Sequence, residues 1–158
     1  MATRTRTLVV AADFIPLYDR VRGTVNVWPK TYGLTPIAHV SDTDVFDLDD
    51  TIRILGRDTM QPALEEIRAR ATITVPAVVC GIAEVARLLG VHRVLAANWD
   101  LRGQLPPPAA VLRPAVNEHG VKARQLKVWT LEQFPPAMYS TDDAKKAAQE
   151  IAKQNMID

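Results

Sequence analysis

An internal repeat constrains this chain more than any other feature of its sequence. When Trp28 is aligned with Trp99, an offset of 71 residues, apolar residues coincide without a gap, among them Leu17 with Leu88 and Leu34 with Leu105. A second stretch, "VFDLDD" (45–50), matches "VWTLEQ" (128–133) at an offset of 83. The second copy therefore carries 83 − 71 = 12 additional residues, which fall within "RPAVNEHGVKARQ". Because two copies of one fold need the same core, these matches predict a degenerate duplication.

Helical periodicity is clearest in the second copy. Residues 82–89 place Ile82, Val85, Ala86 and Leu89 on one helical face, and a glycine follows at the usual position of a helix C-cap. A second helix is expected at 93–101. The first copy predicts a short helix near 13–18 and a weaker second one that contains a glycine and ends at a proline. Two further helices are expected at 59–71 and in the tail, where Ser140 or Thr141 is the predicted cap.

Several residues of the second copy occur together in a known pattern. "GIAEVARLLGV" (81–91) is followed by Trp99, by "RGQLPPP" (102–108) and by "VW" (128–129). This succession of helix, glycine turn, helix, hairpin and helix resembles the winged helix-turn-helix of the excisionase and MerR-like family. The resemblance covers about a third of the chain well, and the first copy, 12–55, matches only weakly. It implies DNA binding, with the second helix in the major groove and the hairpin wing on the neighbouring backbone or minor groove.

Together, the repeat and the resemblance predict a mainly α fold with small β-hairpins: two tandem winged helix-turn-helix lobes joined by a helix. A chain of 158 residues has room for one ordinary domain or two small ones. The predicted boundaries are 1–57 for the N-terminal lobe, 58–79 for a linker helix and extended segment, 80–139 for the C-terminal lobe and 140–158 for the C-terminal helix.

The candidate DNA-binding residues are those that the resemblance places on reading helices, on the wing or on an N-terminal arm. Arginine suits guanine and asparagine suits adenine, whereas lysines of a wing suit phosphates. In the second copy Val94 and Leu95 interrupt the polar positions, so base reading there looks reduced. The candidates are Arg22, Thr24, Asn26 and Lys30 in the first copy, His92, Arg93, Asn98 and Arg102 in the second, Lys122, Arg124 and Lys127 on the wing, and Arg4 and Arg6 on the arm.

Composition gives no independent sign of a nucleic-acid partner, because the formal net charge is only +1. Residues 82–128 carry seven basic side chains against three acidic ones, and the rest of the chain compensates. The ordinary alternative for each basic stretch is a solvated surface or, for the first residues, a disordered terminus.

Chemistry other than binding finds little support. The single cysteine, Cys80, allows no internal disulfide, and the three histidines share no metal-ligand spacing. Five aspartates in "SDTDVFDLDD" lack the central glycine and terminal glutamate of a calcium loop, so they are expected to cap a helix. No nucleophile–base arrangement is present. We therefore expect no enzyme, no catalytic residue, no metal and no cofactor.

The expected function is sequence-specific binding of double-stranded DNA by a transcriptional regulator or phage-type repressor. One alternative is an excisionase-like architectural factor for site-specific recombination. Another is a phage structural or packaging component that uses the fold for protein contacts. Expected partners besides DNA are a second copy of the chain or a recombinase. No apolar run spans a membrane, and a reducing cytoplasm is the simplest compartment.

Overall fold

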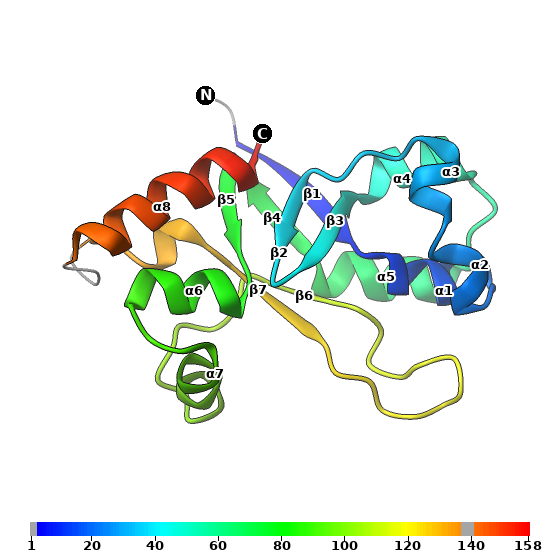
Figure 1. Ribbon diagram of the computed structural model, residues 1–158. Helices are drawn as coiled ribbons and strands as arrows, with labels where there is room; N and C mark the ends of the chain where they lie inside the picture. Colours follow the sequence, from blue (N-terminus) through cyan, green and yellow to red (C-terminus); the bar gives the residue numbers. More distant parts are fainter. Residues whose placement is uncertain (1–2, 137–140) are drawn as a thin grey trace.

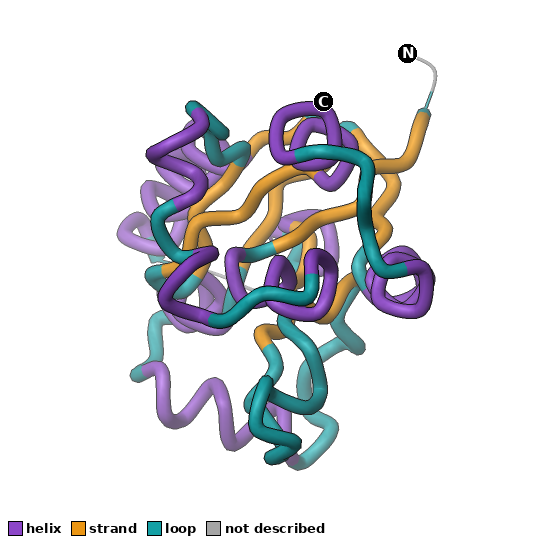
Figure 2. The backbone as a smooth tube through the Cα atoms, turned by 90° about the vertical axis from the view of Figure 1, so that its right-hand side faces the viewer, coloured by secondary structure: helices purple, strands orange, loops and turns teal. Residues whose placement is uncertain are grey.

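The computed structural model describes residues 3–136 and 141–158, which form two four-stranded antiparallel sheets with helices around them (Figure 1). The first sheet belongs to residues 4–75, the N-terminal unit, and the second to residues 77–157, the C-terminal unit. Strands of both sheets occupy the interior, and helices lie outside them (Figure 2).

The N-terminal unit contains four strands, a 3-10 turn and five helices. Strand β1 leads into the turn η1 and three short helices; the hairpin β2–β3 then leads into two longer helices and the last strand. In order, the elements are β1 (Arg4–Val9), η1 (Ala11–Asp13), α1 (Phe14–Tyr18), α2 (Arg22–Val25), α3 (Trp28–Tyr32), β2 (Ala38–Val40), β3 (Thr43–Asp47), α4 (Leu48–Leu55), α5 (Gln61–Arg70) and β4 (Thr72–Val75).

The C-terminal unit follows the same plan with fewer and longer helices. Helix α6 begins after Gly81, whose N–H donates to Glu84 Oε1 at 2.8 Å, and it ends at Gly90, whose φ of 67° favours glycine. The elements are β5 (Ala77–Cys80), α6 (Ile82–Leu89), α7 (Arg93–Leu101), β6 (Ala110–Leu112), β7 (Leu126–Thr130), η2 (Leu131–Gln133), α8 (Asp142–Asn155) and β8 (Met156–Ile157).

Both sheets have the same strand order, and β1–β3 pairs in the same register as β5–β7. In the hairpins Ala38 pairs with Val45 and Ala110 with Val128, so β2 and β6 are related by an offset of 110 − 38 = 72 residues. The order is β2-β3-β1-β4 in the first sheet and β6-β7-β5-β8 in the second, so each unit places its third strand beside its first. Val9 pairs with Phe46 in the first sheet, and Cys80 pairs with Trp129 in the second. These pairs are related by the offsets of 71 and 83 residues found in the sequence. The predicted duplication therefore agrees with the pairing of the strands.

Equivalent elements of the two units contact each other reciprocally. Helix α5 packs against β6, and its counterpart α8 packs against β2. Arg70 Nη1 donates to the carbonyl of Val111 at 2.9 Å, while Asn155 Nδ2 donates to the carbonyl of His39 at 3.0 Å. Since α5 corresponds to α8 and β6 to β2, the two units are related by an approximate two-fold axis.

The hairpin turn of each unit also contacts the other unit. Ser41, in the β2–β3 turn, donates its backbone N–H to Glu84 at the start of α6 at 3.0 Å. Arg113, which follows β6, donates its backbone N–H to Asp13 at the start of the first helical segment. Ser41 and Arg113 both adopt positive φ, 45° and 75°. Each unit thus anchors the hairpin of the other through a carboxylate.

One apolar core joins the two sheets, and a second lies within the C-terminal unit. The first core includes Leu8, Phe14 and Val45 together with Val79 and Leu112 of the other unit. The second core lies between β5–β7 and the helices α6 and α8; its buried members include Cys80, Val85, Leu88, Trp129, Phe134 and Ile151. Because the first core draws on both sheets, the units share their main hydrophobic stabilisation.

The prediction of a mainly α fold made of tandem winged helix-turn-helix lobes is wrong; the chain has a mixed α+β fold with two antiparallel sheets. The segment interpreted as a linker contributes β4 and β5, and β4 and β8 each return to pair with the first strand of their unit. In the N-terminal unit the expected helix-turn-helix is divided among α1, α2 and α3, each of four or five residues. The predicted boundary at 139–140 lies outside the described residues.

Candidate functional site

A cavity of the described residues forms a cleft between the two units. Helices α1 and α2 of the N-terminal unit form one wall, and residues 113–125, the loop between β6 and β7, form the other. The cavity volume is about 870 Å³. Pockets that bury small organic ligands span roughly 300–1,000 Å³. We refer to this cavity as the inter-unit cleft.

The loop wall of the cleft is fixed by its own hydrogen bonds and by a contact with α2. Asn117 Oδ1 accepts from the backbone N–H groups of His119 and Val121 at 2.9 and 3.0 Å. Glu118 Oε2 accepts from the backbone N–H of Arg22, the first residue of α2, at 3.0 Å. The loop is therefore fixed against α2 of the N-terminal unit.

Positive charge predominates in the inter-unit cleft. Its lining includes four arginines and two acids: Arg20, Arg22, Arg113 and Arg124 against Asp19 and Glu118. Within the described part of the chain, no carboxylate oxygen lies within 4.0 Å of a guanidinium nitrogen of these arginines. Arg113 donates instead to Thr43 Oγ1 at 3.1 Å. The cleft thus offers cations to an anionic ligand.

Apolar and amide groups complete the lining. Val21 on the helix wall and Val116 on the loop wall are 63% and 53% exposed, and Ala12, Ile15 and Pro16 also line the cavity. Asn26, at the end of α2, and Asn117 contribute side-chain amides. A ligand with both an anionic group and an apolar face would be complementary to this mixture.

A buried ion pair lies behind the helix wall. Asp13 is fully buried, and its Oδ1 lies 2.6 Å from Nη2 of Arg70. Burial raises the pKa of Asp13 above its ordinary value, although Arg70 and the backbone N–H of Val10 act in the opposite direction. The same carboxylate accepts from the backbone of Arg113, so it links the helix wall to the start of the loop.

Three of the residues predicted to bind DNA line the inter-unit cleft: Arg22, Asn26 and Arg124. Thr24 is exposed on α2, and Lys122 is exposed on the loop. Lys30 lines a neighbouring, smaller cavity together with Asn26. Sequence reasoning missed Arg20 and Arg113, because proximity between the two units is visible only in the folded chain.

The remaining predicted residues lie elsewhere or already have partners. Lys127 Nζ is 2.6 Å from Asp100 Oδ2, and Arg93 is 3.9 Å from Asp42. His92 caps α7, with Nδ1 accepting from the backbone of Val94, while Asn98 and Arg102 are exposed. Arg4 and Arg6 belong to β1 rather than to a free arm, and both donate to the backbone oxygen of Asp158.

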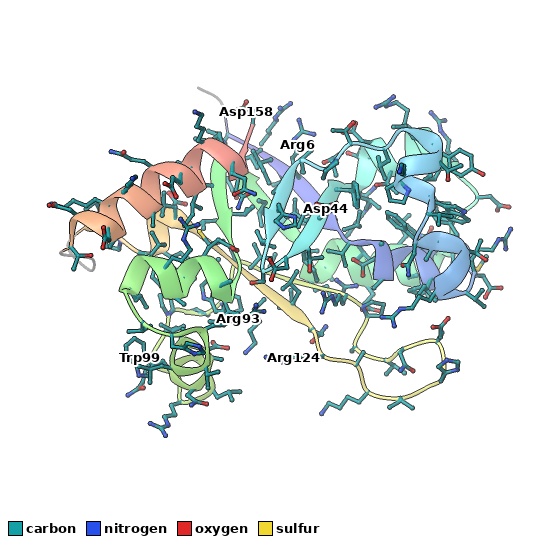
Figure 3. All side chains as sticks on the ribbon, viewed as in Figure 1. Arg6, Asp44, Arg93, Trp99, Arg124 and Asp158 are labelled. Carbon is teal, nitrogen blue, oxygen red and sulfur yellow. The ribbon has the colours of Figure 1, made fainter. Side chains whose placement is uncertain are left out.

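Helix α7 presents an apolar face to solvent. Val94, Leu95 and Leu101 are 62%, 41% and 79% exposed, and they share one side of the helix with Asn98 and Arg102. Both views of the backbone place α7 and the loop 113–125 as projections from the same side of the molecule (Figures 1 and 2). Arg93 and Arg124 lie on that side (Figure 3).

The buried thiol is not suited to chemistry. Burial raises the pKa of Cys80 to about 12, and the nearby Glu84 carboxylate contributes in the same direction. At neutral pH the thiol is therefore protonated and poorly nucleophilic.

Among the described residues, no helix is both long and apolar enough to cross a lipid bilayer. Comparison of the chain with protein-family models, curated proteins and solved structures gave no match in any of the three.

Proposed function

We propose that this protein binds double-stranded DNA and that arginines of both units hold the phosphate backbone at the inter-unit cleft. The supporting observation is that one cavity is lined by Arg20 and Arg22 from one unit and by Arg113 and Arg124 from the other. Cations without a nearby carboxylate are available for phosphate oxygens, and such contacts provide most of the non-specific affinity of DNA-binding proteins.

The arrangement of projecting elements is compatible with a duplex. Helix α7 and the loop 113–125 extend from the same side, with Arg93 and Arg124 on that side (Figure 3). A duplex is too wide for a cavity of about 870 Å³, so it would lie across the cleft rather than within it. Lys122 on the loop and Arg102 after α7 are exposed and add positive charge to these two projections.

Base reading, in this proposal, belongs to Asn26 rather than to α7. Side chains that distinguish bases usually form hydrogen bonds to their edges, and Asn26 is exposed and lines the inter-unit cleft. The corresponding face of α7 carries Val94, Leu95 and Leu101, which offer only apolar contacts.

The test is a titration of a labelled random-sequence duplex at about 50 mM and about 200 mM salt. Wild type should bind more weakly at the higher salt, and Arg124→Ala should reduce the slope of log K against log salt by about one. Arg53→Ala is the matched control, because Arg53 is an exposed arginine of α4 that does not line the cleft. Absence of salt-dependent binding by the wild type would contradict the proposal.

A second candidate function is a structural or assembly role based on protein contacts. The exposed apolar face of α7 favours it, since a helix in water usually turns such residues inward. Sedimentation of the wild type should then show self-association that Leu101→Ser abolishes. A monomer at all accessible concentrations would exclude assembly through this face by the chain alone.

A further inference from the structure

The loop 113–125, which forms one wall of the inter-unit cleft, departs from the two-fold relation of the units. In the N-terminal unit, β2 and β3 are joined by the two-residue turn Ser41–Asp42. In the C-terminal unit, β6 and β7 are separated by residues 113–125. The additional chain forms the wall opposite α2.

The loop 113–125 has a defined conformation, because hydrogen bonds within it fix its backbone. Val116 and Lys122 form an isolated antiparallel bridge, and Ala123 donates its backbone N–H to the carbonyl of Ala115 at 2.9 Å. The contact between Glu118 and the backbone of Arg22 then fixes the distance between the two walls. Such pre-organisation lowers the entropic cost of binding a ligand.

The groups exposed inside the cleft specify a ligand with two parts. Arg22 and Arg124 suit a phosphate, and Arg113 lies with them in the lining. Val21 and Val116, exposed on opposite walls, suit a flat apolar group that would remove both from water. The Asn26 amide can donate and accept hydrogen bonds along the edge of such a group.

We propose that the inter-unit cleft binds one nucleoside phosphate, with the phosphate held by arginines of the lining and the base between Val21 and Val116 beside Asn26. The ligand is either a free nucleotide or one unit of a single strand, since both present the same chemistry. This inference goes beyond the proposed function, because a nucleoside phosphate would enter the cavity, whereas a duplex would lie across it.

Calorimetric titration of the full chain tests the proposal. The probes are the four common ribonucleoside 5′-triphosphates, a short single-stranded DNA of mixed sequence, the matching nucleosides and inorganic phosphate. At least one nucleotide or the strand should bind, and the nucleoside and phosphate alone should each bind at least about tenfold more weakly. Binding by free nucleotides alone, or by the strand alone, supports the proposal and identifies the source of the ligand.

Substitutions of cleft residues test whether the ligand binds in the inter-unit cleft. Val116→Glu introduces a carboxylate at an exposed position of the wall, and Arg124→Ala removes a cation; each should weaken binding about tenfold or more. Asn26→Ala should reduce the preference among bases, and Arg53→Ala should have no effect. Absence of binding by every nucleotide and by the strand overturns the inference, as does binding that Val116→Glu and Arg124→Ala leave unchanged.

The duplex titration separates this inference from the proposed function. Salt-dependent duplex binding without binding of any nucleotide or single strand overturns the inference alone. Nucleotide binding without duplex binding overturns the proposed function and leaves the inference standing.

Discussion

At the scale of single residues, Asp13 and Glu84 show how one structural role can be filled in two ways. Both follow the first strand of their unit and accept a hydrogen bond from a backbone N–H three residues earlier, at 2.9 and 2.8 Å. Both also accept from the hairpin of the other unit. Asp13 is fully buried and paired with Arg70, whereas Glu84 is half-buried. Burying the carboxylate of Asp13 therefore costs more desolvation free energy than burying that of Glu84.

Asp13→Ala should destabilise the protein by roughly 3–5 kcal/mol, because it leaves the largely buried Arg70 and two backbone donors without this acceptor. Asp13→Asn should cost less, since burial raises the pKa of Asp13 and an amide oxygen can still accept. Glu84→Ala, which loses two backbone hydrogen bonds without an ion pair, should cost roughly 1–3 kcal/mol. Urea unfolding measures these differences; equal losses for Asp13→Ala and Glu84→Ala would contradict the account of the ion pair.

At the scale of elements, α7 and the loop 113–125 are the projections whose roles differ most from those that the winged-helix resemblance implies. The outward face of α7 carries exposed apolar side chains. Lys127 of β7 already forms an ion pair with Asp100 of α7. The loop, by contrast, brings Arg124 to the same cavity as Arg22 and Asn26. We therefore assign ligand binding to the loop and α2, and no base contact to the apolar side chains on the outward face of α7.

Leu101→Ser and Val94→Ser should leave the free energy of unfolding within about 0.5 kcal/mol of wild type, because these side chains are already exposed. Duplex affinity should also remain unchanged. Thermal unfolding and the duplex titration measure the two quantities. A loss of roughly 1–3 kcal/mol in duplex affinity would instead show that α7 contacts bases directly.

At the scale of the whole molecule, the two units form a single structure rather than two independent domains. The first core contains residues of both sheets, and the hairpin of each unit is anchored to the other. An isolated unit would expose one side of this core and lose the reciprocal hydrogen bonds. Small domains have little stability in reserve for such a loss.

The separate fragments 1–75 and 76–158 should therefore lack cooperative thermal unfolding, and mixing them should restore it. The fluorescence of the second fragment reports the change, because Trp129 is fully buried in the intact chain and Trp99 is half-buried. A cooperative transition in either isolated fragment, at the temperature of the intact protein, would show that the units fold independently.

Local signals in the sequence were sufficient for several helices. Helices α6 and α7 have the predicted bounds, because the signals lie within each segment: α6 has apolar periodicity and the C-cap Gly90, and Gly103 follows the Arg102 C-cap of α7. The tail helix also begins as expected, with Thr141 Oγ1 accepting from the backbone of Ala144. The helix expected at 59–71 is α5, Gln61–Arg70.

The sheets and the cleft depend on contacts between distant residues, which a single sequence does not reveal. The extended segment expected within 58–79 is "TITVPAVV" (72–79), but its two halves pair in different sheets, Ile73 with Arg6 and Ala77 with Ile157. Similarly, Arg22 and Arg124 were separate candidates in two supposed lobes, whereas folding places them in one cavity. The winged-helix interpretation failed because the pattern it used covers helices and hairpin but not β4 and β8.

The most direct test of the account is a double-mutant cycle on Arg22 and Arg124 for the tightest-binding nucleotide or strand. If both guanidiniums contact one ligand in one cleft, the loss of binding free energy in Arg22→Ala/Arg124→Ala should differ from the sum of the two single losses by roughly 0.5–3 kcal/mol. Pairing Arg124→Ala with Arg53→Ala provides an additive reference. The claim that the two units build one binding site would be contradicted if the losses of binding free energy for Arg22→Ala and Arg124→Ala add within about 0.5 kcal/mol.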